Sequence, residues 1–570
     1  MQNRVLYNAD KARELYRNNL KKDKKRIYNA AIVGGVLAAL VFLCVLGFSR
    51  VLAGGHSTFG AAVKDIYNNS LKSPEYILTK SEKALDDKWD KAESSVKAAL
   101  TKAYDGYRKG DIEYANAINV INAFDQLESA KDMTESVKAD VEAIEQGRKA
   151  YDSAKDLKIS GDLAGALFAY LSVEESDTLN YKTALEKAKE IELDARDGIS
   201  YKINEYLCKY DIDGARAYVD SLFSKLGDSE FITNEKDRIE AYYTEQTDLV
   251  TFEGPVEHLF THCLIAYPEL CYSSPSMTAS LDEDCITPSE FTKILNALYE
   301  KDYILIDINM LINETEAGVE LGEVKIPRGK TPFVFSVDDV TYDSRKMHTG
   351  MVDKLIVGED GRVCTYTKHA DGTEVISYEN EAFPILDEFV RQHPDFTFRG
   401  ARGTLCNTGF DGVLGYRTQD DPTEDVDPEY EKEQAKLVAQ ALKDEGWTFA
   451  SHSYGHAQMN QKDLEYIKKD TDNWIEEVTA IIGETKIMVW PYGASIREGE
   501  AHKYIYDAGF RLFCGVGVKP FMSKEPDGYG IFMDRKALDG YSLRNRRDKY
   551  MYLFDTEEVW DPLRPKEITW

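Results

Sequence analysis

An uncharged apolar run near the N-terminus constrains this 570-residue chain more than any other feature. The run extends from Asn29 to Phe48 and contains no Asp, Glu, Lys or Arg. At a rise of about 1.5 Å per residue, a helix of this length spans the hydrocarbon core of a bilayer, which is about 30 Å thick. A charge near the centre of such a helix costs about 2.5–3.5 kcal/mol, so its absence favours insertion. We therefore predict one transmembrane helix over residues 29–48.

The charges on the two sides of this run predict its orientation. Residues 1–27 carry nine Lys and Arg against three acidic residues, a net charge of +6, whereas the whole chain carries −30. The positive-inside rule then places residues 1–28 in the cytoplasm, as a basic tail, and the acidic bulk on the other side of the cell membrane. We expect an uncleaved, single-pass signal anchor. A cleaved signal peptide is the alternative, although its apolar core usually has only about 7–15 residues.

Composition excludes several further classes of protein. An excess of 100 acidic over 70 basic residues argues against a nucleic-acid partner, which needs a basic surface. The apolar fraction of 43% is sufficient for hydrophobic cores, and the length indicates several domains. The eight cysteines form no CxxC pair, which argues against a zinc ribbon or redox motif. Cys263, Cys271 and Cys285 are close enough in sequence for an extracytoplasmic disulfide, with buried free thiols as the alternative.

Residues 49–248 are predicted to be helical, because apolar residues recur at three- and four-residue spacing and no Pro occurs between Pro74 and Pro255. A weak repeat lies within them: GDIEYA, GDLAGA and YDIDGA begin at Gly110, Gly161 and Tyr210. The period resembles a degenerate tetratricopeptide-like array of helix pairs, although those repeats are shorter. Such an array is either a stalk or a platform for a protein partner.

From residue 249 to residue 570, helical patterns alternate with short apolar strands. This alternation predicts an α/β domain with a parallel sheet or β/α barrel, whose loops at the carboxyl ends of the strands carry the chemistry. A hairpin is predicted over residues 354–367. The predicted helices are 289–301, 380–393, 430–445, 462–482 and 498–508, and the predicted strands are 303–308, 331–339, 396–401, 447–451, 486–490 and 510–517.

Polar residues follow three of these strands. Asp338 and Asp339 are adjacent at a strand end, where alternation of side chains lets one bind a metal while the other acts as a base. His452 and His456 are four residues apart after a later strand, a spacing that can place both on one ion. With Asp339 they make a two-His, one-carboxylate set, which leaves positions open for water and substrate.

Together with Pro491-Tyr492-Gly493 after the next strand, these motifs resemble the polysaccharide deacetylase family with the NodB homology domain. The resemblance implies a distorted (β/α) barrel over residues 249–570. It also implies removal of N-acetyl, or sometimes O-acetyl, groups from glycans with a divalent metal, usually zinc. It assigns Asp338 as the general base and the backbone N–H of Tyr492 to the oxyanion hole. Ser453 would orient its loop by hydrogen bonding, and the metal ligands would be Asp339, His452 and His456.

The sequence departs from the family pattern at several positions. Val337 and Val340 replace an aromatic residue and a Gly around the Asp pair. Val489 stands where the family has an Arg that pairs with the base, and Trp490 makes this motif similar to that of the poly-N-acetylglucosamine deacetylase branch.

The usual late Leu-x-His motif, which supplies the general acid, is also missing. The segment MDRKALDGYS offers substitutes: Arg535 could steady Asp338, and Asp539 could be the acid. Surface salt bridges are the alternative interpretation of both residues.

The sequence as a whole predicts a membrane-anchored, metal-dependent N-deacetylase of a cell-wall or cell-surface glycan, either peptidoglycan or an exopolysaccharide. The alternative is a catalytically weak or inactive glycan-binding or scaffolding protein of the cell envelope, in which the helical repeats hold a partner.

Overall fold

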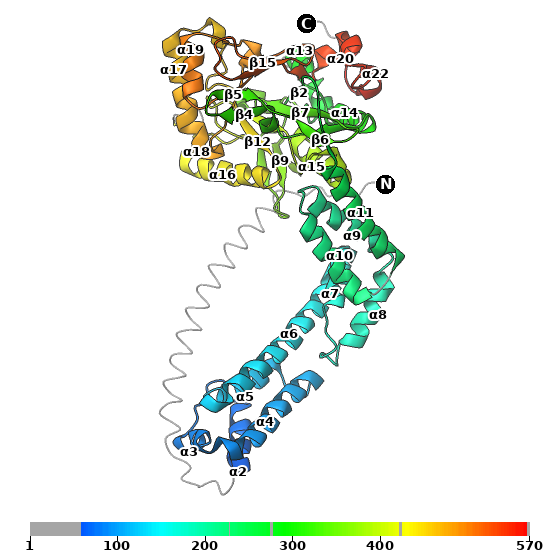
Figure 1. Cartoon of the computed structure of the whole chain (residues 1–570), viewed down its shortest axis with the longest axis vertical. Helices are drawn as coiled ribbons and strands as arrows, with labels where there is room; N and C mark the ends of the chain where they lie inside the picture. The colour runs from blue at the N-terminus through cyan, green and yellow to red at the C-terminus, as the bar shows by residue number, and fades with distance from the viewer. Residues whose placement is uncertain (1–58, 227–228, 274–277, 421–424, 567–570) are drawn as a thin grey trace. The chain divides into compact units, whose positions relative to one another are not determined.

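The structure is a computed structural model that describes residues 59–226, 229–273, 278–420 and 425–566 (Figure 1). The predicted cytoplasmic tail and the predicted transmembrane helix lie outside these residues. Within the described ranges, no helix is both long enough and apolar enough to cross a membrane. The described chain divides into two compact units, one formed by residues 59–203 and 216–236 and the other by 204–215 and 237–566.

The first unit is helical, as predicted. Gly110 and Gly161, which begin two of the repeats, lie at the C-terminal ends of helices with φ of 80° and 93°. Tyr210, at the start of the third repeat, also has a positive φ, of 57°. The repeat therefore marks the left-handed residue that ends one helix before the next begins. The helices are α2 (Phe59–Ser70), α3 (Lys80–Lys83), α4 (Trp89–Lys109), α5 (Tyr114–Phe124), α6 (Lys131–Ser160), α7 (Leu163–Leu171) and α8 (Tyr181–Ile191), followed by α9 (Arg196–Leu207), α10 (Ile212–Leu226) and α11 (Glu230–Thr247), which contain residues of both units.

The second unit is an α/β domain around one long sheet with the strand order β15-β16-β14-β13-β12-β11-β7-β2-β17, in which β3 also pairs with β7. The pairs are parallel except β15 with β16. The sheet curls into a half-barrel. Its strands are β2 (Glu257–His262), β3 (Tyr303–Leu305), β7 (Thr331–Asp338), β11 (Thr404–Asn407), β12 (Thr448–Ser451), β13 (Ile487–Val489), β14 (Leu512–Cys514), β15 (Met522–Lys524), β16 (Ile531–Met533) and β17 (Lys536–Ala537).

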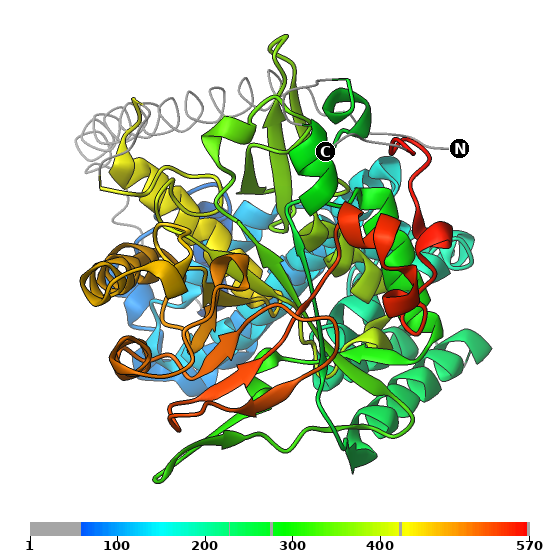
Figure 2. The same ribbon diagram turned by 90° about the horizontal axis from the view of Figure 1, so that it is seen from above.

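Smaller sheets and the helices complete this unit. Seen from above, α16 to α19 (yellow and orange) lie on one side of the strands and α20 to α22 (red) on the other (Figure 2). The smaller sheets contain β1 (Leu249–Thr251) with β6 (Lys325–Pro327), β4 (Ile312–Thr315) with β5 (Gly318–Leu321), and β8 (Lys354–Val357), β9 (Val363–Lys368) and β10 (Glu374–Ser377). The helices are α12 (Pro268–Cys271), α13 (Thr278–Asp284), α14 (Pro288–Glu300), α15 (Ala382–Gln392), α16 (Pro428–Asp444), α17 (Leu464–Asn473), α18 (Thr479–Ile482), α19 (Glu500–Asp507), α20 (Gly540–Asn545), α21 (Arg547–Tyr550) and α22 (Thr556–Val559).

The five predicted helices and the predicted hairpin are present, but the strand predicted at 396–401 is wrong. That segment bends instead, with left-handed Arg399 and Gly400, and the strand is β11, further along the chain. The bend wraps around the buried guanidinium of Arg402, which donates to the carbonyls of Gly400 and Ala401 at 3.2 Å and to Asp387 at 2.8 Å. A straight strand cannot direct consecutive carbonyls at one side chain, since they alternate in direction.

Alternation along β7 determines which side chains face the inside of the curled sheet. Phe333, Phe335 and Val337 belong to a core cluster that also contains buried residues of α14, α15 and α16. Val334 belongs to a second cluster with Cys406, Ala450 and Val489. Ser336 and Asp338 follow Val334 at two-residue intervals, so they share its face. The seven described cysteines are free and buried. Cys263, Cys271 and Cys285 are therefore buried free thiols, which was the alternative to a disulfide.

Candidate functional site

The site lies where the carboxyl ends of neighbouring parallel strands meet. Asp338 is the last residue of β7, and His262, the last residue of β2, is its partner in the strand register. Strand β12 ends at Ser451, directly before His452. Because these strands are parallel, the residues that follow them come to one edge of the sheet.

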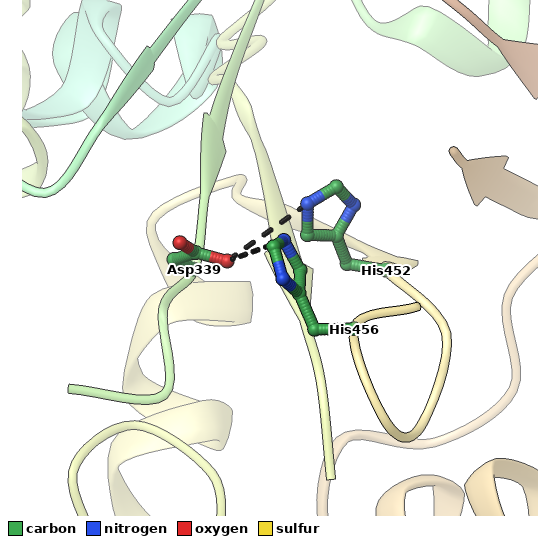
Figure 3. A group of neighbouring side chains, drawn as sticks. All are labelled: Asp339, His452 and His456. Carbon is green, nitrogen blue, oxygen red and sulfur yellow. Dashed lines mark ion pairs between the residues drawn. The ribbon is translucent and has the colours of Figure 1, made fainter. Parts of the chain in front are cut away.

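Asp339, His452 and His456 come together at this edge. One ligand atom from each lies within 4.8 Å of the others. The Nε2 atoms of His456 and His452 are 3.3 and 3.9 Å from Oδ1 of Asp339. Figure 3 shows the carboxylate pointing toward both rings. Asp339 and His456 have positive φ values of 59° and 47°. Such backbone strain costs on the order of 1–3 kcal/mol per residue and is typical of functional sites.

The chemistry of this group fits a divalent metal. Two imidazoles and one carboxylate are the donors of an open catalytic zinc site. His452 Nδ1 lies 2.9 Å from the carbonyl of Val489, so this nitrogen carries the proton and Nε2 is the nitrogen that can bind a metal. Burial lowers the pKa of His452 to about 4, which keeps the imidazole neutral, as a ligand must be.

Lys346 stabilises the ionised form of Asp339 from the side opposite the two imidazoles. Its ammonium lies 3.7 Å from Oδ2, while Oδ1 is the oxygen near the two imidazoles. Burial opposes ionisation of this carboxyl, but Lys346 and His456 hold its pKa below the ordinary value. Asp339 therefore presents an ionised oxygen to the histidine pair.

Asp338 is bound by Arg535, as the sequence analysis suggested for this pair. Nη1 and Nη2 donate to Oδ1 and Oδ2 at 2.7 and 2.9 Å, and both side chains are buried. Burial opposes ionisation of Asp338, yet Arg535 holds its pKa below the ordinary value. Arg535 also donates to Ser336 Oγ at 3.2 Å, and His258 Nε2 lies 2.9 Å from the same hydroxyl. The carboxylate is thus fixed in direction and stays charged.

Asp539, Tyr492 and Ser453, which were also predicted to belong to the site, occupy three different environments. Asp539 is the N-cap of α20 and accepts from the backbone N–H of Ser542 at 2.6 Å; its pKa is raised by burial. Tyr492 lies in the turn Pro491–Gly493, with its ring 4.7 Å from that of His456. The hydroxyl of Ser453 is buried and has no hydrogen-bond partner among the described residues, so the loop-orienting bond expected of it is not seen.

His262 is a residue at the site that the sequence analysis missed. Its Nδ1 lies 2.9 Å from the carbonyl of Asp284 on α13. It is close enough to lower the pKa of Asp338, Asp339 and Asp539. The segment EHLFTH forms strand β2 and ends in His262, next to the strand that ends in Asp338, but Leu259 and Phe260 are its only apolar residues.

Comparison with known proteins finds a family match in one part of the chain. Residues 426–513 match the family model for polysaccharide deacetylase, and they contain His452, His456 and Tyr492. Among solved structures, the Streptococcus pyogenes deacetylase PplD in complex with acetate aligns with a TM-score of 0.27 and 14% identity over 51% of this chain and 94% of that chain. No curated protein matches the sequence.

Proposed function

We propose that this protein is a metal-dependent hydrolase that removes acetyl groups from the amino sugars of an extracytoplasmic glycan, peptidoglycan or exopolysaccharide. The observation that carries this proposal is the position of the Arg535-bound Asp338 beside the Asp339–His452–His456 group. The deacetylase family match over residues 426–513 supports the reaction type.

The residues that would hold the ion, zinc in the first place, are Asp339 through Oδ1 and His452 and His456 through Nε2. When bound, such an ion polarises the acetyl carbonyl as a Lewis acid. Asp338 accepts the proton of the attacking water. Arg535 occupies one lone pair on each oxygen of Asp338, which leaves others to take that proton.

His262 is assigned the role of general acid in place of Asp539. Its Nδ1 hydrogen is directed at Asp284, so Nε2 is the nitrogen that gains and loses a proton. After the water oxygen has bonded to the acetyl carbon, His262 delivers this proton to the amide nitrogen as the C–N bond breaks, which releases acetate and a free amine. Asp539 is less suited because its carboxylate already caps α20.

The scaffolding alternative depended on the missing family Arg and the missing late His. Arg535 reaches Asp338 from the turn after β16, and His262 is the register partner of Asp338 on the neighbouring strand β2. Both groups are therefore present near the base, which supports the enzyme over the inactive scaffold.

The purified full-length protein tests the proposal. It should release acetate from N-acetylglucosamine oligomers or peptidoglycan, lose this activity on treatment with a chelator, and regain it with added zinc. Asp338→Asn should abolish release while bound metal is retained. Metal binding without acetate release from any acetylated glycan, or an unchanged rate in Asp338→Asn, would refute the enzyme.

A further inference from the structure

Glu381 is a fully buried carboxylate outside the group of reacting residues. It is the N-cap of α15, and its Oε1 accepts from the backbone N–H of Ala382 at 2.8 Å. The backbone N–H of Leu264 donates to both of its oxygens, at 3.1 and 3.2 Å, and the hydroxyl of Tyr342 donates to Oε2 at 3.3 Å. One carboxylate thus joins donors from three separate segments of the chain.

Two of these segments carry the proposed catalytic residues. Leu264 follows His262 by two residues, and Tyr342 follows Asp339 by three. The same two loops also touch directly, since the thiol of Cys263 lies 3.4 Å from the carbonyl oxygen of Asp339. Glu381 therefore sits behind the site at the point where the loop after β2 and the loop after β7 come together.

We propose that Glu381 is a positioning residue that sets the placement of His262 relative to Asp338. This inference rests on the proposed function, because it assigns the two residues their acid and base roles. A helix cap needs only one acceptor oxygen. Here both oxygens are used, and two of the three donors lie on the catalytic loops. Displacing a catalytic group by about 1 Å costs on the order of 100-fold in rate, so the length of these bonds matters to the reaction.

The electrostatics of Glu381 provide a way to separate positioning from simple packing. Burial raises its pKa to about 7, although the bonds from Ala382, Leu264 and Tyr342 oppose this. The titratable groups that face it are Tyr342 and Cys263, and burial raises the pKa of each, so both stay neutral near pH 7. No described Lys or Arg forms an ion pair with Glu381. Between pH 5.5 and 8, Glu381 is therefore the group in this contact that changes charge.

Glu381→Gln is the decisive variant, and Glu388→Gln on the same helix is its matched control. Gln keeps an acceptor oxygen for the N–H groups of Ala382 and Leu264. It has no negative charge to strengthen the hydrogen bonds from the loops after β2 and β7. At pH 8 we expect kcat to fall by about 10–100-fold, as for the loss of a group that orients a catalytic residue, with KM and bound metal unchanged. The thermal midpoint should stay the same or rise, because a buried charge without a cation has been removed.

The pH dependence of the reaction rate provides a second test. As the pH falls through 7, wild-type Glu381 gains a proton and comes to resemble the variant, so the ratio of the wild-type rate to that of Glu381→Gln should shrink toward one by pH 5.5. A ratio that does not change with pH, or a loss of thermal stability that parallels the loss of rate, would overturn the positioning role.

A third arm does not depend on activity. The rate at which diethyl pyrocarbonate modifies His262, followed by peptide mass spectrometry, should change in Glu381→Gln and not in Glu388→Gln. If His262 responds but the wild-type protein releases no acetate, the proposed function fails and the positioning contact stands. If acetate is released but neither kcat nor His262 responds, the contact is only structural and the inference is wrong.

Discussion

Arg535 and Asp338 form a bidentate ion pair inside the curled sheet, with N–O distances of 2.7 and 2.9 Å and almost no exposure to solvent. The two residues are nearly 200 positions apart in the sequence. A buried pair of this kind adds little net stability, but removing one partner is costly because the other charge is left alone. The pair therefore predicts how substitutions on each side will behave.

Arg535→Met should destabilise the protein by about 3–5 kcal/mol, since Asp338 would remain buried without its cation. Arg535→Lys should lower stability less but still lower kcat, because an ammonium lacks the rigid pair of N–H donors that fixes the direction of a carboxylate. Urea unfolding and acetate release measure the two effects separately. Equal activity of the Lys variant and the wild type would show that the direction of the carboxylate is unimportant.

The metal group predicts a selective loss of bound ion. Asp339→Ala and His452→Ala each remove one of three ligands, so each should reduce metal affinity by more than the roughly 10–100-fold that loss of an outer partner costs. His348→Ala is the control, since His348 is exposed and lies outside the group. Elemental analysis after dialysis against zinc, with titration calorimetry, provides the measurement. Full metal content in both ligand variants would place the ion elsewhere.

The sequence predicted the parts of this site that depend on local pattern. Asp338 ends an apolar strand, and Asp339, His452 and His456 follow one. Parallel strands bring such residues to one edge of the sheet whatever the details of the fold. His262 was missed because its strand contains Glu257 and His258, polar residues that a buried strand rarely carries; the structure satisfies them with Tyr552 and Ser336. The bend at Arg402 was also missed, because two of the partners that satisfy this buried Arg, Asp387 and the carbonyl of Cys208, are distant in sequence.

Arg564, close to the C-terminus, predicts a further large effect on stability. Its guanidinium is fully buried and donates to Asp282, to both oxygens of Glu290 and to the carbonyl of Cys285, at 2.6–3.0 Å. Arg564→Ala leaves the buried carboxylate of Glu290 without a cation, whereas Asp282 keeps its pair with Arg544 at 2.7 Å. The substitution should cost about 3–5 kcal/mol in the free energy of unfolding.

The matched control for Arg564 is Arg328→Ala, which removes an exposed pair with Asp248 and should change stability little. Chemical denaturation of the two variants beside the wild type gives the comparison. A similar, small effect of both would mean that the Arg564 cluster is solvated and does not hold α13 and α14 together.

Glu525 predicts how the stability of the α/β domain depends on pH. Its side chain is buried beside His502, Arg497 and Asp527; burial raises its pKa to about 7, although Arg497, which donates to it at 2.8 Å, opposes the shift. The folded protein therefore keeps a proton that the unfolded chain releases near pH 4.5. Stability contributed by this group is complete below about pH 4.5 and is lost as the pH rises to 7.

Glu525→Gln should flatten this dependence and stabilise the protein at pH 8 relative to wild type, by up to about 1.4 kcal/mol for each pH unit between the two pKa values. Arg497 stays partly in solvent, so losing its partner costs less than losing a fully buried one. Urea unfolding at pH 5 and pH 8 measures the difference. The rate of acetate release at saturating substrate should be unchanged, because Glu525 does not touch the metal group. If the variant is less stable than wild type at pH 8, the Arg497 bond outweighs the burial of the charge, and the carboxyl titrates below the pH range assigned to it here.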